Sequence, residues 1–435
     1  MSNLLKNGTY SIINQITGLV VALATGIIIA RNLGPEGKGS VYLVTQTASL
    51  MSVFFSFGIG PSLLYHLKKD KISKETAFFL VLAHLILTNL ILVTAYLLFK
   101  DPLLNLLNTK FSELYLIVIG VLISFNMSAN LFGNILMRDS MGINRWALIS
   151  SFSSLIYLIG LVIFIILFRF GLEGVFFALF ISLTVNVLSL IHQIGRVRIR
   201  SLAFEFSLLG SIARYGLGIF STAMFLTSLY RVDIFLVNSL LSVSELGVYS
   251  VAVNLSELLL IVPVAMGVVL FPYLSSLKGS EQNMTVALTS RLSFLLGIGG
   301  SVLVVLIGYP FIKFVFGEQF LNAYNSTLLL LPGLIAMTMN LALNNYAAAI
   351  GKPLVGGVLF AFGASVNVVL NLIFLKEFGI NGAAFFSSVS YIITTYGFVL
   401  FVSSKSGLDK LELVIPQKSD LVFVKGKVSS FIFSK

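Results

Sequence analysis

The chain has 435 residues, of which 57% are hydrophobic and only 10% are charged, and its mean hydropathy is +1.00. This composition excludes an ordinary water-soluble protein and predicts that most of the chain lies in a lipid bilayer. The net charge of +11 does not indicate nucleic-acid binding, because the basic residues are dispersed between apolar runs. The lack of cysteine excludes disulfides and thiolate metal sites, and three scattered histidines cannot form a zinc cluster.

The apolar runs are continuous rather than alternating, which favours α-helices over a membrane β-barrel. Each span needs about twenty mainly apolar residues. We therefore predict an all-α membrane protein of about twelve transmembrane helices, over residues 9–30, 41–66, 77–99, 113–137, 147–168, 174–194, 207–236, 247–274, 288–309, 324–350, 354–375 and 382–403.

The basic residues between these helices fall mainly on one side of the membrane. The side that holds the N-terminus carries Lys68, Lys69, Lys71 and Lys74, three arginines in residues 196–200, and the basic tail. Because cytoplasmic loops are enriched in Lys and Arg, this bias predicts that both termini are cytoplasmic.

Two halves of the sequence resemble each other. Residues 170–177 match residues 378–385 at an offset of 208, and Asn130 and Asn134 correspond to Asn340 and Asn344 at an offset of 210. We predict a duplication with a six-helix lobe over 1–195, a cytoplasmic linker over 196–206, a second lobe over 207–403 and a basic tail over 404–435. Such lobes would share one orientation about a pseudo-two-fold axis along the membrane normal, with a central cleft between them.

Charged side chains inside the spans are candidate functional residues, because each costs about 2.5–3.5 kcal/mol in hydrocarbon. Glu257 shares a helical face with Ser250 and Asn254, and we expect it to face a cavity. The alternative is a structural hydrogen bond or ion pair with a neighbouring helix. Asp233 and His84 are further candidates for coupling to an ion gradient, although a lone buried histidine is more often only hydrogen-bonded.

Arginines are candidates for binding an anionic substrate. Arg231 points to a different face from Asp233, so the two are not expected to pair. Arg31 could equally extend to the membrane interface, and Arg214 could equally be an orientation signal.

Asparagines at i, i+4 spacing form polar stripes on apolar helices. Asn126, Asn130, Asn134 and Arg138 form one stripe, and Asn340 with Asn344 forms another. We expect these stripes to line water. For Asn367 and Asn371 we favour hydrogen bonding between helices.

Several short motifs together resemble the polysaccharide transporter family of the multidrug/oligosaccharidyl-lipid/polysaccharide superfamily of flippases. They are residues 30–37 (ARNLGPEG), 231–233 (RVD), 245–252 (ELGVYSVA), 271–275 (FPYLS), 351–353 (GKP) and 367–371 (NVVLN). The resemblance covers residues 1–403 and implies a two-lobed transporter with a fold like that of the multidrug exporters of the superfamily.

The substrate that this resemblance implies is an undecaprenyl-diphosphate-linked oligosaccharide, such as an O-antigen or capsule repeat unit. It would move from the cytoplasmic to the outer leaflet of the bacterial inner membrane. Other implied partners are membrane lipids, a polysaccharide polymerase and a chain-length regulator. No cofactor is expected beyond a coupling ion, H⁺ or Na⁺.

Two other functions are weighed against the flippase. A cation-coupled multidrug exporter would need acidic groups in its cleft, and the excess of arginine over acid argues against it. A membrane-embedded polymerase or glycosyltransferase would need a catalytic constellation at one membrane face, and none is evident in the sequence. The chain is therefore not expected to be an enzyme.

Overall fold

The computed structural model describes residues 2–106, 113–139, 141–195, 206–417 and 420, and these residues contain helices and no strand. The first half contains α1 (Ser2–Ser56), α2 (Ile59–Lys68), α3 (Lys74–Leu106), α4 (Glu113–Leu136), α5 (Gly142–Leu161), the π-helix η1 (Val162–Leu167) and α6 (Gly171–Ile194). The second half contains α7 (Phe206–Leu240), α8 (Val243–Ser256), the 3₁₀-helix η3 (Glu257–Leu260), α9 (Ile261–Ser276), α10 (Ser280–Phe311), the π-helix η4 (Ile312–Phe316), the 3₁₀-helix η5 (Glu318–Phe320), α11 (Ala323–Ala349), α12 (Leu354–Ser406) and α13 (Lys410–Val414).

Two of these helices are each broken at a glycine. Gly34 divides α1 and Gly379 divides α12, with φ angles of 66° and 59° that fit glycine best. A straight helix as long as α12 would measure about 80 Å, whereas the hydrocarbon core is about 30 Å thick. Each arm of α12 is therefore long enough for a span of its own.

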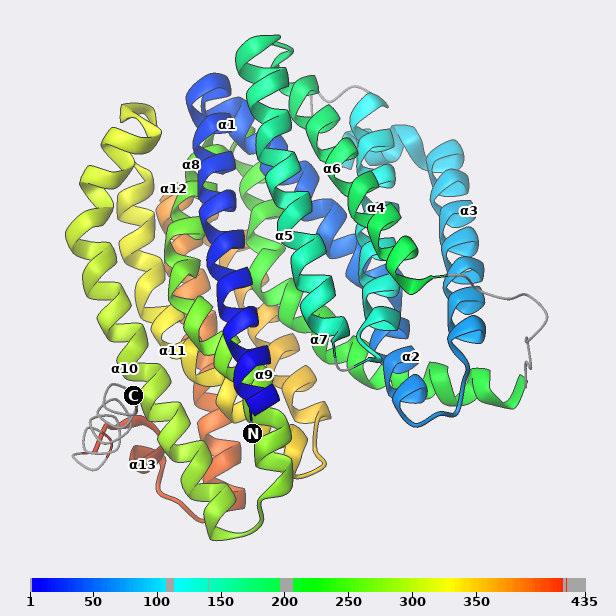
Figure 1. The fold of residues 1–435 in the computed structure, drawn as a ribbon. Coiled ribbons are helices and arrows are strands. Elements are labelled where there is room, and N and C mark those ends of the chain that lie inside the picture. The colour runs from blue at the N-terminus through cyan, green and yellow to red at the C-terminus, as the bar shows by residue number, and fades with distance from the viewer. Residues whose placement is uncertain (1, 107–112, 140, 196–205, 418–419, 421–435) are drawn as a thin grey trace.

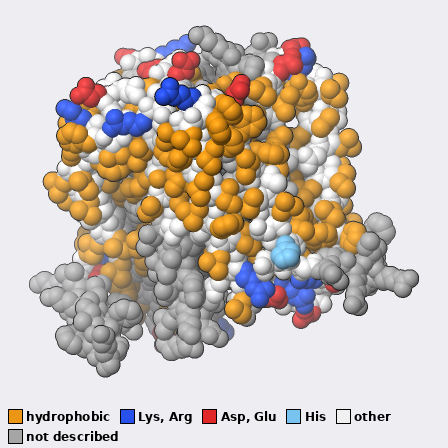
Figure 2. Space-filling view, turned by 45° about the horizontal axis from the view of Figure 1, so that its top comes forward, with side chains coloured by type: hydrophobic (Ala, Val, Ile, Leu, Met, Phe, Trp, Pro, Cys, Tyr) orange, Lys and Arg blue, Asp and Glu red, His pale blue; other side chains and the backbone are white. Residues whose placement is uncertain are grey.

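The length and composition of the helices confirm a multi-pass membrane protein. Within the described ranges, 9 helices could cross a membrane, or up to 10 if the bent pair of α1 and α2 counts as one span. The prediction of about twelve spans is reached only if the two arms of α1 and of α12 count separately. On the face that Figure 2 shows, a broad hydrophobic band lies between charged side chains along the upper rim and others at the lower rim.

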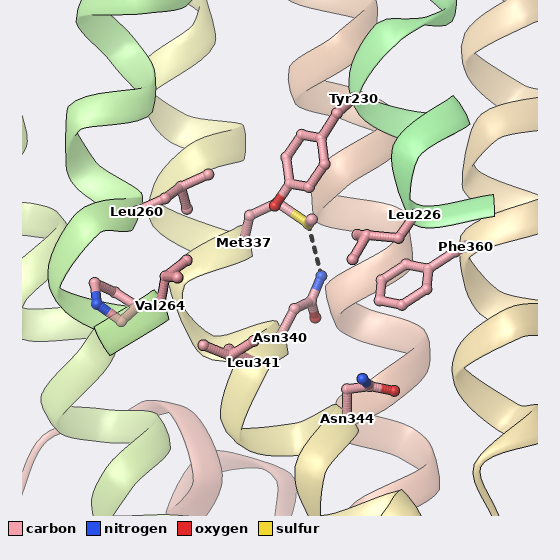
Figure 3. Close-up of a pocket in the computed structure, with 10 residues that line it drawn as sticks. Leu226, Tyr230, Leu260, Val264, Met337, Asn340, Leu341, Asn344 and Phe360 are labelled. Carbon is pink, nitrogen blue, oxygen red and sulfur yellow. Dashed lines mark hydrogen bonds between the residues drawn. The ribbon is translucent and has the colours of Figure 1, made fainter. Parts of the chain in front are cut away.

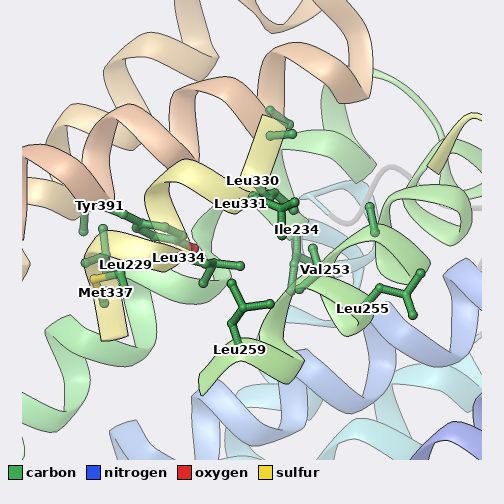
Figure 4. Close-up of a cluster of buried hydrophobic side chains, with 14 of the residues drawn as sticks. Leu229, Ile234, Val253, Leu255, Leu259, Leu330, Leu331, Leu334, Met337 and Tyr391 are labelled. Carbon is green, nitrogen blue, oxygen red and sulfur yellow. The ribbon is translucent and has the colours of Figure 1, made fainter. Parts of the chain in front are cut away.

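The buried side chains form separate clusters for the two halves of the chain. The largest cluster, which we name the C-terminal cluster, draws mainly on α7 to α13, with Ala30, Tyr42 and Leu43 of α1. It includes the leucines and Tyr391 shown in Figure 4. Three smaller clusters draw mainly on α1 to α6. In Figure 1 the helices α3 to α6 lie on one side of the molecule and α8 to α12 on the other. The predicted lobe boundaries stay predictions, because residues 196–205 of the linker lie outside the described residues.

The sequence repeat coincides with a repeated backbone feature. Gly171 begins α6 with a φ of 60°, and Gly379 separates the arms of α12 with a φ of 59°. These two glycines correspond at the offset of 208 noted above. The matched segments thus each have a glycine with a positive φ between two helices, which is consistent with a duplication.

The described part of the tail packs against the helices, which differs from the solvated tail that would be the default expectation. Asp409 and Glu412 form a capping box at the start of α13, and Leu413 is fully buried. Beyond α13, Asp420 forms a buried ion pair with Arg291 of α10, with 2.7 Å between Oδ2 and Nε. Residues 418–419 and 421–435 lie outside the described part.

Candidate functional site

Helix α1 forms the boundary between the two halves. Ala30 and Tyr42 belong to the C-terminal cluster, whereas Ile29 and Val41 pack with α5, η1 and α6. Each arm of α1 therefore has one face on each half. We name the surface where α1 and α2 meet α7, α8 and α9 the seam.

An ion pair lies beside this seam. The guanidinium of Arg231 in α7 donates two hydrogen bonds to the carboxylate of Glu257, from Nη1 to Oε1 at 2.6 Å and from Nη2 to Oε2 at 3.2 Å. Both side chains are about three-quarters buried, at 22% and 26% exposure. Tyr42 of α1 lies beside the pair, with its buried hydroxyl next to the guanidinium of Arg231.

The local structure explains the position of Glu257. Helix α8 ends at Ser256 and the chain continues as one 3₁₀ turn, so Glu257 begins that turn. Pro263 then lies in the first turn of α9, where a missing N–H costs least. The sequence left open whether Glu257 faces a cavity or pairs with a neighbouring helix. The structure contains the ion pair with α7. Charge-assisted hydrogen bonds of this kind are roughly twice as strong as those between neutral groups.

Asp233 does not join this pair. Its carboxylate, 2% exposed, accepts hydrogen bonds from the Tyr249 hydroxyl at 2.5 Å and the Ser387 hydroxyl at 3.0 Å. Asn367 donates to Ser387 at 3.0 Å, and Asn371 donates to Asn367 at 2.8 Å. The network joins α7, α8 and both arms of α12, as expected for Asn367 and Asn371. The buried Oδ1 of Asn371 has no partner in the described part of the chain.

Arg31 lies at the end of the molecule that holds Gly34, which we name the Gly34 end. It is exposed, and its Nε donates to the carbonyl of Val315 at 2.8 Å while Nη2 donates to that of Phe314. The side chain thus connects α1 to η4 of the other half. A role of Arg31 in binding substrate stays a prediction.

The asparagine stripe on α4 lies apart from Arg231. Asn134 donates to Asn130 at 3.1 Å, and the start of α2 packs over both at Gly60. Arg138, at the end of the stripe, forms an ion pair with Asp70 at 2.9 Å. Asn126 is half-buried. Asn130 and Asn134 therefore contact each other, whereas Arg138 contacts the α2–α3 connection.

The second asparagine pair lines a small cavity of about 50 Å³ in the C-terminal half (Figure 3). Asn340 donates to the sulfur of Met337 at 2.7 Å, and its buried Oδ1 has no partner among the described residues. Tyr230, next to Arg231 in sequence, and Asn344 also line the cavity. Ligand pockets usually measure about 300–1,000 Å³, so this cavity would have to widen to admit a sugar. The central cleft stays a prediction.

The remaining candidates lie elsewhere. Arg214 is exposed on α7, and His84 donates from Nε2 to the carbonyl of Phe55 at 2.9 Å. Among the described residues, no group of three His, Cys, Asp or Glu side chains could hold a metal ion. Tyr42 was not predicted as a site residue. Lys38 falls between the predicted spans 9–30 and 41–66, whereas in the structure it lies within α1 and is 6% exposed. The i, i+4 spacing of Lys38 and Tyr42 was the available signal.

Comparison with known proteins gives consistent results. Residues 28–325 match the profile of the family described as "Polysaccharide biosynthesis protein". A Shigella flexneri protein named "Putative O-antigen transporter" is 22% identical over 408 residues, covering 90% of this chain and 96% of the relative. A Haloferax volcanii protein named "Probable low-salt glycan biosynthesis flippase Agl15" is 23% identical over 176 residues, covering 40% of this chain and 37% of the relative. An uncharacterized membrane protein of Methanocaldococcus jannaschii matches over 26% of its length.

Solved structures share the fold at low sequence identity. An inward-facing multidrug transporter of the superfamily superposes with a TM-score of 0.75 at 17% identity, covering 91% of this chain and 98% of that one. The lipid II flippase MurJ in an inward closed conformation gives a TM-score of 0.70 at 16% identity, covering 99% of both chains. These proteins are transporters and flippases rather than catalysts. The family resemblance found in the sequence is confirmed, and the chain belongs to the family described as "Polysaccharide biosynthesis protein".

Proposed function

We propose that the chain is a flippase that moves an undecaprenyl-diphosphate-linked oligosaccharide from the cytoplasmic to the outer leaflet of the bacterial inner membrane. The observation that carries the proposal is the partly buried, bidentate pair of Arg231 and Glu257 beside the seam. The family and the names of its relatives support this class of substrate.

The chemistry of the substrate explains why such a pair is useful. A sugar head group cannot cross about 30 Å of hydrocarbon, because its hydroxyls and diphosphate would lose their water. The planar fork of arginine donates two hydrogen bonds to a phosphate and stays charged at every relevant pH. While no substrate is bound, Glu257 neutralises Arg231 and lowers the cost of keeping the guanidinium away from bulk water. A diphosphate would take the place of the carboxylate.

Coupling to an ion gradient fits Asp233 better than Glu257. Glu257 is already neutralised by Arg231, whereas the hydrogen-bond partners of the Asp233 carboxylate are uncharged. A proton or Na⁺ at Asp233 would neutralise a buried charge that joins α7, α8 and α12. Asp233→Asn should remove any dependence of transport on pH or Na⁺. Unchanged dependence in that variant would reject this role.

One end of the molecule holds the start of α1 together with α2 and α13 (Figure 1). The cluster of Lys68, Lys69, Lys71 and Lys74 follows α2 in sequence, which supports a cytoplasmic location for that end. Both termini would then be cytoplasmic. We name this end the α13 end.

Export of surface polysaccharide tests the function. Cells that lack the native gene would carry the wild-type chain, Arg231→Lys, Arg231→Ala, or the control Arg145→Ala, which changes an exposed arginine in α5. A lost bidentate contact costs about 1.5–3 kcal/mol, so Arg231→Ala should lower export by about tenfold or more. The lysine variant should fall between Arg231→Ala and the wild type.

The outcome also separates the alternatives. Lipid-linked oligosaccharide should accumulate in the Arg231→Ala cells, and its level should stay normal in the Arg145→Ala control. Normal surface polysaccharide in Arg231→Ala cells would discard the role of this residue. If the wild-type chain instead protected cells from cationic drugs and left polysaccharide unchanged, the multidrug exporter would be the better assignment.

A further inference from the structure

A buried lysine without an anionic partner lies in α1, one turn from the seam residue Tyr42. Lys38 is 6% exposed. In the described part of the chain, no carboxylate lies within 4.0 Å of its ammonium group, the salt-bridge distance that the five ion pairs there satisfy. Lysine is almost never fully buried unless it is paired. An uncompensated ammonium in this position destabilises the empty protein, so its presence requires an explanation.

The faces of α1 show where this ammonium lies. A methyl group built on Gly26 would lie 3.3 Å from Nζ of Lys38, so the lysine reaches across to the first arm of α1. Gly26 shares a helical face with Ala30, and Lys38 shares one with Tyr42, because each pair is four residues apart. Ala30 and Tyr42 both pack in the C-terminal cluster. The ammonium therefore lies on the side of α1 that faces the C-terminal half.

A second donor lies on the same face. The buried hydroxyl of Tyr42 lies next to the guanidinium of Arg231 and interacts with it. Residues four apart on a helix are about 6 Å apart, which is within reach of the two phosphates of one diphosphate. Lys38, Tyr42 and Arg231 together supply donors from both sides of the seam. Glu257 pairs with Arg231, and no carboxylate among the described residues forms an ion pair with Lys38.

We propose that Lys38 and Tyr42 bind the phosphate oxygens of a diphosphate from the N-terminal side of the seam, opposite Arg231. The inference rests on the proposed function and adds a second anchor to it. Glu257 occupies Arg231 in the empty protein, so Lys38 is the cation that meets the incoming anion first. Arg231 then exchanges its carboxylate for the same diphosphate.

Binding and stability measured on one set of variants test this assignment. The full chain would be placed in nanodiscs of neutral phosphatidylcholine and titrated with undecaprenyl diphosphate, with undecaprenol as the uncharged comparison. Lys38→Met keeps the length of the side chain and removes its charge. Lys38→Arg keeps the charge. Lys376→Met changes an exposed lysine at the end of the first arm of α12 and serves as the matched control.

The lysine variants have opposite expected effects on binding and stability. Lys38→Met should weaken binding of undecaprenyl diphosphate by about tenfold or more, because a hydrogen bond to a charged group is lost. It should also raise the unfolding temperature of the empty protein, because an unpaired buried charge is removed. Lys38→Arg should keep most of the affinity, and Tyr42→Phe should lose about fivefold. Lys376→Met should change neither quantity.

Inorganic pyrophosphate distinguishes the two sources of the diphosphate group. Pyrophosphate could displace the lipid from the wild type but not from Lys38→Met. This result would show that the diphosphate group alone is recognised. Binding of only the lipid form, still sensitive to Lys38→Met, would assign the site to a lipid-linked diphosphate. Equal binding of undecaprenol would overturn the inference, because no phosphate would then be read.

Two results separate this inference from the proposed function. If the wild type and Lys38→Met bind undecaprenyl diphosphate equally, this inference alone fails. A lower unfolding temperature of Lys38→Met with unchanged affinity would show that Lys38 has only a structural role. If the wild type does not bind the diphosphate lipid, the substrate class fails together with the inference.

Discussion

Close glycine contacts between the two halves occur near both ends of the seam. At the Gly34 end, a methyl group on Gly39 of α1 would lie 1.8 Å from the carbonyl oxygen of Val243, and one on Gly247 of α8 would lie 1.9 Å from that of Pro35. At the α13 end, a methyl group on Gly58 would lie 2.1 Å from the carbonyl oxygen of Gly216. Small residues let backbones meet in this way within membranes.

An alanine at either contact should therefore open one end and leave the other unchanged. Gly247→Ala needs the helices to separate by roughly 1.3 Å, and overpacking of this kind costs about 1–3 kcal/mol. Because the clash exists only while the Gly34 end is closed, the cost shifts the equilibrium toward opening of that end by about 5- to 150-fold. Gly58→Ala should shift the α13 end in the same way, helped by the strain of its φ of 68°.

Thiol labelling can measure the two ends separately, because the chain contains no cysteine. Ser40→Cys, beside Gly39, and Ser62→Cys, in the α2–α7 contact, replace serines that are 7% and 0% exposed. Gly247→Ala should speed maleimide labelling at position 40 only, and Gly58→Ala at position 62 only. The control Gly218→Ala, whose methyl group would meet nothing within 4 Å, should change neither rate.

Equal acceleration at both positions by a single alanine would refute this reasoning, because it would show a general loosening of the structure. No change at either position would show that the glycine contacts carry no closing energy.

The remaining predictions concern stability. The hydrogen bonds from Arg291 lower the pKa of Asp420 below its usual range. The pair therefore stabilises the docked tail above the ordinary carboxyl pKa, and this contribution should be lost as the pH falls below about 4. Amide hydrogen exchange of residues 408–417 should become faster at acidic pH. In Asp420→Asn this exchange should be faster already at pH 7. An unchanged exchange rate of the tail in the variant would contradict the role of the pair. Separately, Gly363→Ala should destabilise the protein by about 1–3 kcal/mol, because its methyl group would lie 2.0 Å from Oγ1 of Thr394. The control Gly299→Ala has open space around it, and a thermal melt that shows equal losses in the two variants would contradict this account.

Hydropathy predicted the helices well where one span is one apolar run. The predicted spans 113–137 and 174–194 agree closely with α4 and α6. Helix α10 begins at Ser280, eight residues before the predicted 288, because its first turns are polar and hydropathy detects only the part in lipid. The packed tail was also missed, because its contacts join residues about 130 positions apart, Arg291 and Asp420.

The candidate site could be predicted only in part. Composition and spacing identified Arg231 and Glu257 as exceptional residues in apolar helices. Their pairing could not be derived, because it depends on the 3₁₀ turn at Glu257 and on the angle between α7 and α8. The prediction that Lys38 lies in a loop was wrong for a related reason. A lysine near the end of a span usually extends to the interface, and only the packing of α1 against the other half shows that this one is buried.

The arrangement of charges also indicates how substrate binding and movement of the halves relate. Arg231 and Glu257 both belong to the C-terminal half, so their ion pair does not hold the two halves together. Contacts that do so near the ends include the backbone contacts at glycines, the hydrogen bonds from Arg31 to η4, and those of Ser62 and His66 in α2 with Ile212 and Ser211 in α7. A diphosphate that replaces Glu257 therefore breaks no ion pair between the halves. A ligand shifts a conformational equilibrium only through its different affinity for the two states. In the proposed mechanism that difference has to come from groups on the opposite side of the seam, and Lys38 with Tyr42 are the donors placed to supply it.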